Sequence, residues 1–302
     1  MFTTSTGKLL PVWAFVFSAI LSAIAFVVSG NIAADVVGHR LFLFELVFRP
    51  LLSLLLLGIF VWLLTVGDEL EDHRIAAQGL PRTKGCLKQF VIGSAIGFLL
   101  TVIAVVPLHF WGHTRSTFDR GLIVVPKIAA VVIVLLCGAL AEELMFRGYP
   151  FQHLEEGIGP VWAIAVFSVL YGFLHLLNPG AGRWGVANTI LIGILLSIAY
   201  LRTRALWLPW GIHFGWNATL GFLFGLPVSG FHFFNAFVRT TATGPKWVTG
   251  GSYGVEAAAT GAVAILAGIL IVWKLPVTEL PGPKVVTSSQ PSLRGSFSGI
   301  KS

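Results

Sequence analysis

The sequence contains few charged residues for its length. Asp, Glu, Lys and Arg make up 11% of the 302 residues, whereas hydrophobic residues make up 56% and the mean hydropathy is +0.86. Soluble domains carry about 25% charged residues. This shortage of charge excludes an ordinary soluble enzyme and predicts an all-α polytopic integral membrane protein.

Cysteine is equally scarce, and the basic residues do not cluster. Cys86 and Cys137 have no metal-ligand spacing and lie beside or inside apolar segments, so neither a disulfide framework nor a zinc–thiolate site is expected. The net charge is +7, but the lysines and arginines stand singly between apolar runs. We therefore expect contact with the lipid bilayer and its head groups, and no nucleic-acid partner.

Eight apolar segments predict eight transmembrane helices. About 20 residues, at 1.5 Å per residue, cross about 30 Å of hydrocarbon. The first segment is not followed by a cleavage site of the A-x-A type, so we expect it to remain as a helix rather than to be removed as a signal peptide. The segments cover about residues 11–28, 46–66, 87–107, 122–145, 161–177, 186–201, 206–226 and 255–273.

These segments divide the chain into four parts. Residues 1–121 hold the N-terminal helices and a polar cytoplasmic loop, and residues 122–226 form a central helical core. Residues 227–279 supply a loop and the last helix. Residues 280–302 are rich in Ser, Gly, Pro and Lys and predict a disordered tail.

Eight spans place both termini on one side of the membrane, and the positive-inside rule selects that side. With a cytoplasmic N-terminus, and with Arg147 set aside as a motif residue, eleven basic residues lie inside and eight lie outside. This bias predicts a multi-pass protein of the cell membrane with both termini in the cytoplasm. The inside set is Lys8, Arg74, Arg82, Lys84, Lys88, Arg202, Arg204, Lys274, Lys284, Arg294 and Lys301, and the outside set is Arg40, Arg49, Arg115, Arg120, Lys127, Arg183, Arg239 and Lys246.

Three charged residues follow directly after the apolar run 128–140. A charge near the bilayer centre costs about 2.5–3.5 kcal/mol, so such residues usually face a protein interior or a wet cavity. Glu143 and Arg147 are four residues apart and can pair on one face of a helix, which alone could be simple neutralisation at the membrane edge. Glu142 is rotated by about 100° from Glu143, so its partners must come from other helices.

Two histidines and an asparagine in other apolar segments are candidate partners. His175 lies near the far end of one segment, and His213 and Asn217 lie four residues apart in another. A lone histidine in an apolar helix is usually a packing residue, but two of them with an unpaired glutamate indicate a functional site.

This set of residues suits attack by water on a carbonyl group. A glutamate can take a proton from water, an imidazole can hold the water, and a second imidazole with an amide can stabilise the oxyanion. Glu142, His175 and His213 could equally bind a zinc ion with an open coordination position. The residues leave a metal-free and a metal-assisted mechanism open.

A shared site also requires that the motifs lie at one depth. If the helix from residue 160 begins at the cytoplasmic side, His175 lies about 22 Å along it, whereas His213 lies only about 10 Å along the helix from residue 206. Strong tilts, unequal helix ends or an extension of the preceding helix through residues 151–155 would bring the motifs together. The site depends on one of these geometries.

The three motifs resemble, in their order, those of the CAAX protease and bacteriocin-processing family of membrane endopeptidases, which includes the type II CAAX prenyl proteases. The resemblance covers residues 122–226, and the segment 79–82 is similar to the polar stretch that often precedes the family core. Tyr171 stands where the family usually has Phe, so its hydroxyl is either an additional donor or a tolerated change. The motifs are Glu142-Glu143-x-x-x-Arg147, an aromatic-x-x-x-His that ends at His175, and His213-x-x-x-Asn217.

The resemblance implies a role for each motif residue. Glu142 and His175 would activate water, and His213 and Asn217 would form the oxyanion pocket. Glu143 and Arg147 would support the site. The resemblance also implies a peptide or protein substrate at the membrane, as in CAAX-box protein processing. Members are often described as metalloproteases, although a metal-free glutamate mechanism has also been proposed for them, so a bound Zn²⁺ stays open.

Two other classes of function compete with the endopeptidase hypothesis. One is a non-catalytic membrane scaffold or immunity-type protein that keeps the cavity to bind a partner. The other is a proton-coupled transporter in which Glu142, His175 and His213 relay protons. The sequence has no inverted repeat between its halves, which argues against transport. All three motifs are complete, which argues against a non-catalytic relative.

Overall fold

The structure is a computed structural model that describes residues 10–38, 40–66, 78–118, 124–235 and 237–276. The predicted disordered tail, residues 280–302, lies outside the described residues. The helices are α1 (Pro11–Val37), α2 (Leu41–Val66), α4 (Cys86–Val105), α5 (Leu108–Trp111), α6 (Val124–Arg147), α7 (Tyr149–Ile158), α8 (Pro160–Leu174), α9 (Arg183–Thr203), α10 (Trp207–Ala218), α11 (Lys246–Thr249) and α12 (Ala259–Lys274). Short 3₁₀ or π-helical turns cover His175–Leu177, Thr219–Leu223, Gly251–Tyr253 and Val255–Ala257.

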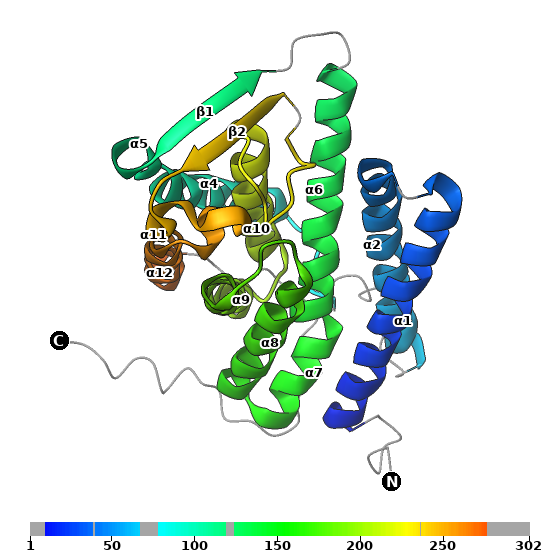
Figure 1. Cartoon of the computed structure of the whole chain (residues 1–302). Coiled ribbons are helices and arrows are strands. Elements are labelled where there is room, and N and C mark those ends of the chain that lie inside the picture. The colour runs from blue at the N-terminus through cyan, green and yellow to red at the C-terminus, as the bar shows by residue number, and fades with distance from the viewer. Residues whose placement is uncertain (1–9, 39, 67–77, 119–123, 236, 277–302) are drawn as a thin grey trace, which may run out of the picture.

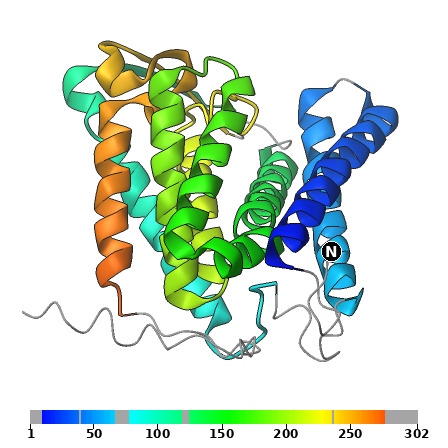
Figure 2. The same ribbon diagram turned by 90° about the horizontal axis from the view of Figure 1, so that it is seen from below.

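Helix α6 runs through the middle of the molecule (Figure 1). Helices α1 and α2 stand on one side of it, and α4, α9, α10 and α12 lie on the other, an arrangement also visible from below (Figure 2). Strands β1 (His113–Phe118) and β2 (Val238–Thr243) form a two-stranded antiparallel sheet that pairs His113 with Thr243. This sheet departs from the predicted all-helical pattern; its two strands, which are rich in Thr, lie between the apolar segments.

Six helices among the described residues are long and apolar enough to cross a membrane. The chain is therefore a polytopic helical membrane protein, as its composition predicts. Two of the eight predicted spans form shorter helices: α10 has 12 residues and continues into a π-helical turn, and α12 has 16 residues. The six long segments are Pro11–Val37, Leu41–Leu64, Cys86–Trp111, Val125–Ile158, Pro160–Leu177 and Arg183–Thr203.

Arg49, which the topology count placed outside, lies well inside a transmembrane helix instead. Helix α2 begins at Leu41, so Arg49 lies about two turns from its start and inside the apolar stretch. Its charge is met by Glu45 one turn earlier, with 2.5 Å between Arg49 Nε and Glu45 Oε2. Without Arg49, the predicted external set contains seven basic residues, against eleven in the predicted internal set.

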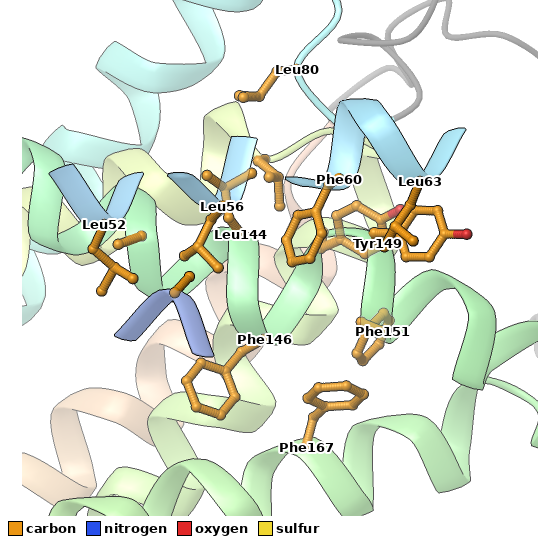
Figure 3. Close-up of a cluster of buried hydrophobic side chains, with 14 of the residues drawn as sticks. Leu52, Leu56, Phe60, Leu63, Leu80, Leu144, Phe146, Tyr149, Phe151 and Phe167 are labelled. Carbon is orange, nitrogen blue, oxygen red and sulfur yellow. The ribbon is translucent and has the colours of Figure 1, made fainter. Parts of the chain in front are cut away.

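A cluster of buried apolar side chains joins α2 to α6, α7 and α8 (Figure 3). Leu56 and Phe60 of α2 and Leu144 of α6 are fully buried in it. Phe151 of α7 packs against Phe167 of α8, with 5.4 Å between the ring centroids. Because Leu144 lies between the charged residues of α6, this cluster fixes the helix face on which those charges emerge.

Glycines allow α4 and α10 to touch backbone to backbone. A Cβ at Gly97 would lie 2.3 Å from a carbonyl oxygen of α10, and a Cβ at Gly215 would lie 2.3 Å from a carbonyl oxygen of α4. Gly93 and Gly211 approach the facing helix just as closely, at 2.4 and 2.2 Å. Such small-xxx-small pairs are typical of membrane helices in close contact. They hold α10, which carries two motif residues, firmly against α4.

The segment 79–82, which resembles the stretch before the family core, anchors the start of α10. The carbonyl oxygen of Gly79 accepts a hydrogen bond from the backbone N–H of Leu206 at 2.6 Å. The carbonyl oxygen of Pro81 accepts one from Trp207 Nε1 at 3.0 Å. Leu80 between them is buried in the core cluster. This polar-looking segment is therefore part of the scaffold that places α10.

Candidate functional site

The charges at the end of α6 form a buried ion pair. Glu143 and Arg147 have no exposed side-chain surface, and Arg147 Nη1 lies 3.4 Å from Glu143 Oε1. Arg147 also donates to the carbonyl oxygen of Gly193 at 3.1 Å and reaches Ser197 Oγ at 3.5 Å, both on α9. The predicted pairing on one helix face is confirmed, and both side chains are fully buried inside the protein.

His213 connects this ion pair to the cavity. Its Nδ1 lies 2.9 Å from Glu143 Oε1, and its Nε2 lies 3.7 Å from Glu142 Oε2. The ring is therefore held between two carboxylates of α6, of which Glu143 is sealed in the core and Glu142 is partly exposed to the cavity. A contact with Glu143 through Nδ1 leaves Nε2 as the nitrogen that can act on a bound molecule.

Glu142 takes its partners from other helices, as its helical position predicts. The Tyr171 hydroxyl of α8 donates a hydrogen bond to Glu142 Oε2 at 2.8 Å. Arg49 of α2 places Nη1 3.6 Å from Glu142 Oε1. Each carboxylate oxygen thus faces a donor, and the hydroxyl that distinguishes Tyr171 from Phe takes part in the site.

One cavity of about 650 Å³ collects the residues of all three motifs. Glu142, His175, His213 and Asn217 line it, whereas Glu143 and Arg147 lie behind its wall. His175 Nδ1 lies 2.8 Å from the carbonyl oxygen of Tyr171, so its Nε2 is the nitrogen without this contact. The structure therefore brings together all six residues that the sequence predicts.

The chain continues beyond α6 into a separate helix, α7, after a break at Gly148. Helix α7 carries the same apolar stretch on to Ile158, through the predicted residues 151–155. Gly159, at a φ of +84°, then reverses the chain into α8, a conformation that glycine adopts readily. His175 directly follows the last residue of α8 and lines the same cavity as His213.

The same residues do not form a metal-binding cluster. Over the part of the chain that the structure describes, no three His, Cys, Asp or Glu side chains are grouped so that they could hold a metal ion. Glu142 Oε2 is engaged by the Tyr171 hydroxyl, and His213 Nε2 lies 3.7 Å from that same oxygen. Glu142, His175 and His213 as placed do not fit a zinc ion, so no step below is routed through one.

Sequence reasoning missed the pair formed by Glu45 and Arg49. Arg49 lines the cavity and lies beside Glu142, yet it stands on α2, far from the motifs in sequence. The available signal was an acid and a base four residues apart within an apolar segment, the same signal that singled out Glu143 and Arg147.

Glu256 is a second carboxylate that the motifs did not indicate. It lies in the turn before α12, is only 4% exposed and lines the cavity. Its oxygens accept hydrogen bonds from Trp216 Nε1 at 3.0 Å and from the backbone N–H of Ser229. Because Trp216 precedes Asn217, this carboxylate helps to fix the wall that presents the amide.

Comparison with known families places this site in a recognised domain. The family model described as "Type II CAAX prenyl endopeptidase Rce1-like" matches residues 124–219. These residues form an Rce1-like type II CAAX prenyl endopeptidase domain. The resemblance drawn from the three motifs is thereby confirmed, and the family implies a membrane protease. No curated protein and no solved structure matches the chain.

The Rce1-like domain covers about a third of the chain and contains all six motif residues. Arg49 and Glu256 lie outside it, on α2 and before α12. The cavity of the Rce1-like domain is therefore completed by side chains that the family match does not include.

Replacement of Arg147 by Met should strongly destabilise the protein. It would leave the fully buried Glu143 carboxylate without its cation, and breaking a buried ion pair in this way costs about 3–5 kcal/mol. Arg204→Met is the matched control, since Arg204 pairs with Glu155 at the surface, where such pairs contribute about 0–1 kcal/mol. Unfolding in detergent measures both, and equal losses would contradict the buried role of Arg147.

Proposed function

We propose that this protein is a membrane-embedded endopeptidase that hydrolyses a peptide bond of a membrane-associated peptide or protein. One observation carries the proposal: residues of three separate motifs, from α6, α8 and α10, line a single cavity of about 650 Å³. A scaffold or a transporter does not require this combination of an ionisable base, two imidazoles and an amide facing one space.

In this proposal Glu142 is the general base. Its carboxylate takes a proton from a water molecule as the water oxygen attacks the scissile carbonyl carbon, and His175 holds that water through Nε2. The Tyr171 hydroxyl at 2.8 Å keeps the carboxylate turned into the cavity. When the tetrahedral intermediate collapses, Glu142 returns the proton to the leaving amine, so the peptide bond is replaced by a carboxylate and an amine.

His213 and Asn217 are the proposed donors to the oxyanion. They lie one helical turn apart on α10 and both line the cavity. Donation by His213 Nε2 requires both ring nitrogens to carry protons, with Glu143 as the acceptor at Nδ1. Such donors are aimed at charge that develops during the reaction, and each contributes about 10²–10³ to the rate.

Glu143 and Arg147 act through His213 in this mechanism. The ion pair holds the imidazole at one angle, because Arg147 is itself tied to two groups of α9. Neither side chain reaches the cavity surface. Their role is to keep the ring in place through each turnover.

The cavity favours an apolar substrate segment. Beyond its polar end it is lined by Phe15 and Phe26 of α1 and Phe48 of α2, so lipid-facing helices supply much of its wall. A peptide held at the membrane by an apolar or lipidated end suits such a lining. Whether the substrate carries a prenyl group is decided by the assay below.

We also propose that all eight apolar segments cross the cell membrane and that both termini are cytoplasmic. The excess of eleven internal over seven external basic residues supports this orientation. Cysteines introduced at positions 5 and 295 should resist a membrane-impermeant thiol reagent in intact cells. Labelling of either one in intact cells would reverse the orientation.

Purified protein in detergent should cleave a fluorogenic library of membrane peptides, with prenylated and unprenylated members. Glu142→Gln keeps the shape of the side chain but removes the base, so kcat should fall by about 10²–10⁴. His213→Ala should lower kcat by about 10²–10³. His153→Ala, which alters a histidine on α7 that does not line the cavity, should retain activity.

A strong chelator separates the two mechanisms that the sequence leaves open. Undiminished cleavage in its presence is the result expected for glutamate-activated water, whereas loss that zinc restores would establish a metal enzyme. Wild type that cleaves no library member, or variants that match wild type, would overturn the endopeptidase proposal. A scaffold or a transporter function would then take its place.

A further inference from the structure

Arg49 on α2 approaches the proposed general base from outside the Rce1-like domain. Its Nη1 lies 3.6 Å from Glu142 Oε1, and its Nε lies 2.5 Å from Glu45 Oε2. The guanidinium also lies over the Phe234 ring, 5.6 Å from the centroid. Three groups thus surround one cation whose side chain is only 20% exposed.

Helix α6 is shaped to receive this side chain. A Cβ at Gly138 would lie 2.4 Å from Arg49 Nη1 and 2.8 Å from its Cδ, so any larger residue would displace the guanidinium from this position. Gly138 is four residues before Glu142 and lies on the same helix face. Next to it, Ser53 Oγ of α2 donates to the carbonyl oxygen of Cys137 at 2.7 Å. The register between α2 and α6 is therefore fixed at this level.

We propose that Arg49 is a positioning residue that holds the Glu142 carboxylate in its working orientation. Tyr171 fixes one carboxylate oxygen and Arg49 faces the other, so the two residues restrain the side chain from opposite sides. Glu45 in turn orients Arg49 by binding its Nε, which leaves the Nη1 side of the guanidinium for Glu142. The consequence of this role for catalysis rests on the proposed function.

This role differs from simple neutralisation of charge on α2. A cation needed only to balance Glu45 would require that contact alone, whereas Arg49 also reaches across Gly138 to Glu142. The two explanations predict different kinetics. A misplaced catalytic group lowers kcat, and a displacement of about 1 Å can cost 10²-fold. Loss of a purely structural cation lowers stability and leaves kcat per folded molecule unchanged.

Kinetics of full-length protein in detergent test the proposal. Arg49→Gln should lower kcat at least tenfold with KM within about twofold, and Arg49→Lys should recover part of the loss because it restores the charge without the planar fork. Gly138→Ala should lower kcat in the same direction, because its Cβ displaces the guanidinium while both charged residues remain.

Two matched controls accompany these variants. Gly58→Ala changes a helical glycine of α2 whose Cβ would meet nothing within 4 Å, and Arg204→Gln removes an arginine from a surface ion pair. Both should keep the kcat of wild type. Arg49→Gln and Gly138→Ala proteins that are folded and keep kcat within twofold of wild type would overturn the proposal.

A stability cycle tests the contact without any cleavage assay. Melting temperatures of wild type, Arg49→Gln, Glu142→Gln and the double variant form a double-mutant cycle. If Arg49 holds Glu142, the double variant loses less than the sum of the two single losses. Additive losses would overturn the proposal even in an active enzyme, whereas coupling in a protein that cleaves nothing would retain it and reject only the proposed function.

Discussion

The site depends on one buried interaction, the contact of Glu143 with both Arg147 and His213. The Glu143 carboxylate has no exposed surface. A buried charge of this kind is tolerated only when neighbouring groups compensate it through hydrogen bonds or ion pairs. Arg147, one turn further along α6, forms an ion pair with Glu143. The Nδ1 atom of His213, on α10, lies 2.9 Å from Glu143 Oε1. Because these donors come from different helices, the pair fixes how α6, α9 and α10 pack. The orientation of the imidazole toward the cavity follows from that packing.

Contacts elsewhere in the protein position the other helices around Glu143, Arg147 and His213. Helix α10 is held by its glycine contacts with α4 and by the segment 79–82 at its start. These contacts fix the position of His213 along the axis of α10 relative to α6. Helix α2 contributes Arg49 and part of the cavity wall, and Glu256 closes the wall from the turn before α12. The Rce1-like domain supplies the proposed reactive groups, whereas helices outside it line other parts of the same cavity.

The sequence predicted the helical class and the six motif residues, because charge inside an apolar segment is costly enough to indicate a site without knowledge of the fold. It also predicted that Glu142 needs partners from other helices. Two of the partners it suggested, His213 and the Tyr171 hydroxyl, do lie beside Glu142. It could not identify Arg49, because the approach of that side chain depends on the space left by Gly138 in a packed helix pair. The short α10 and the two-stranded sheet were missed for a similar reason: hydropathy does not reveal where tertiary contacts end a helix.

The protonation of His213 tests the central claim most directly, because a carboxylate held against Nδ1 requires a proton on that nitrogen. ¹⁵N NMR of the protein with labelled histidine, assigned by comparison with His213→Ala, reports which ring nitrogen carries hydrogen. The account predicts a protonated, hydrogen-bonded Nδ1 in the wild type whose signal shifts in Glu143→Gln. An unprotonated Nδ1, or a signal unchanged in that variant, would contradict the buried contact on which the site depends.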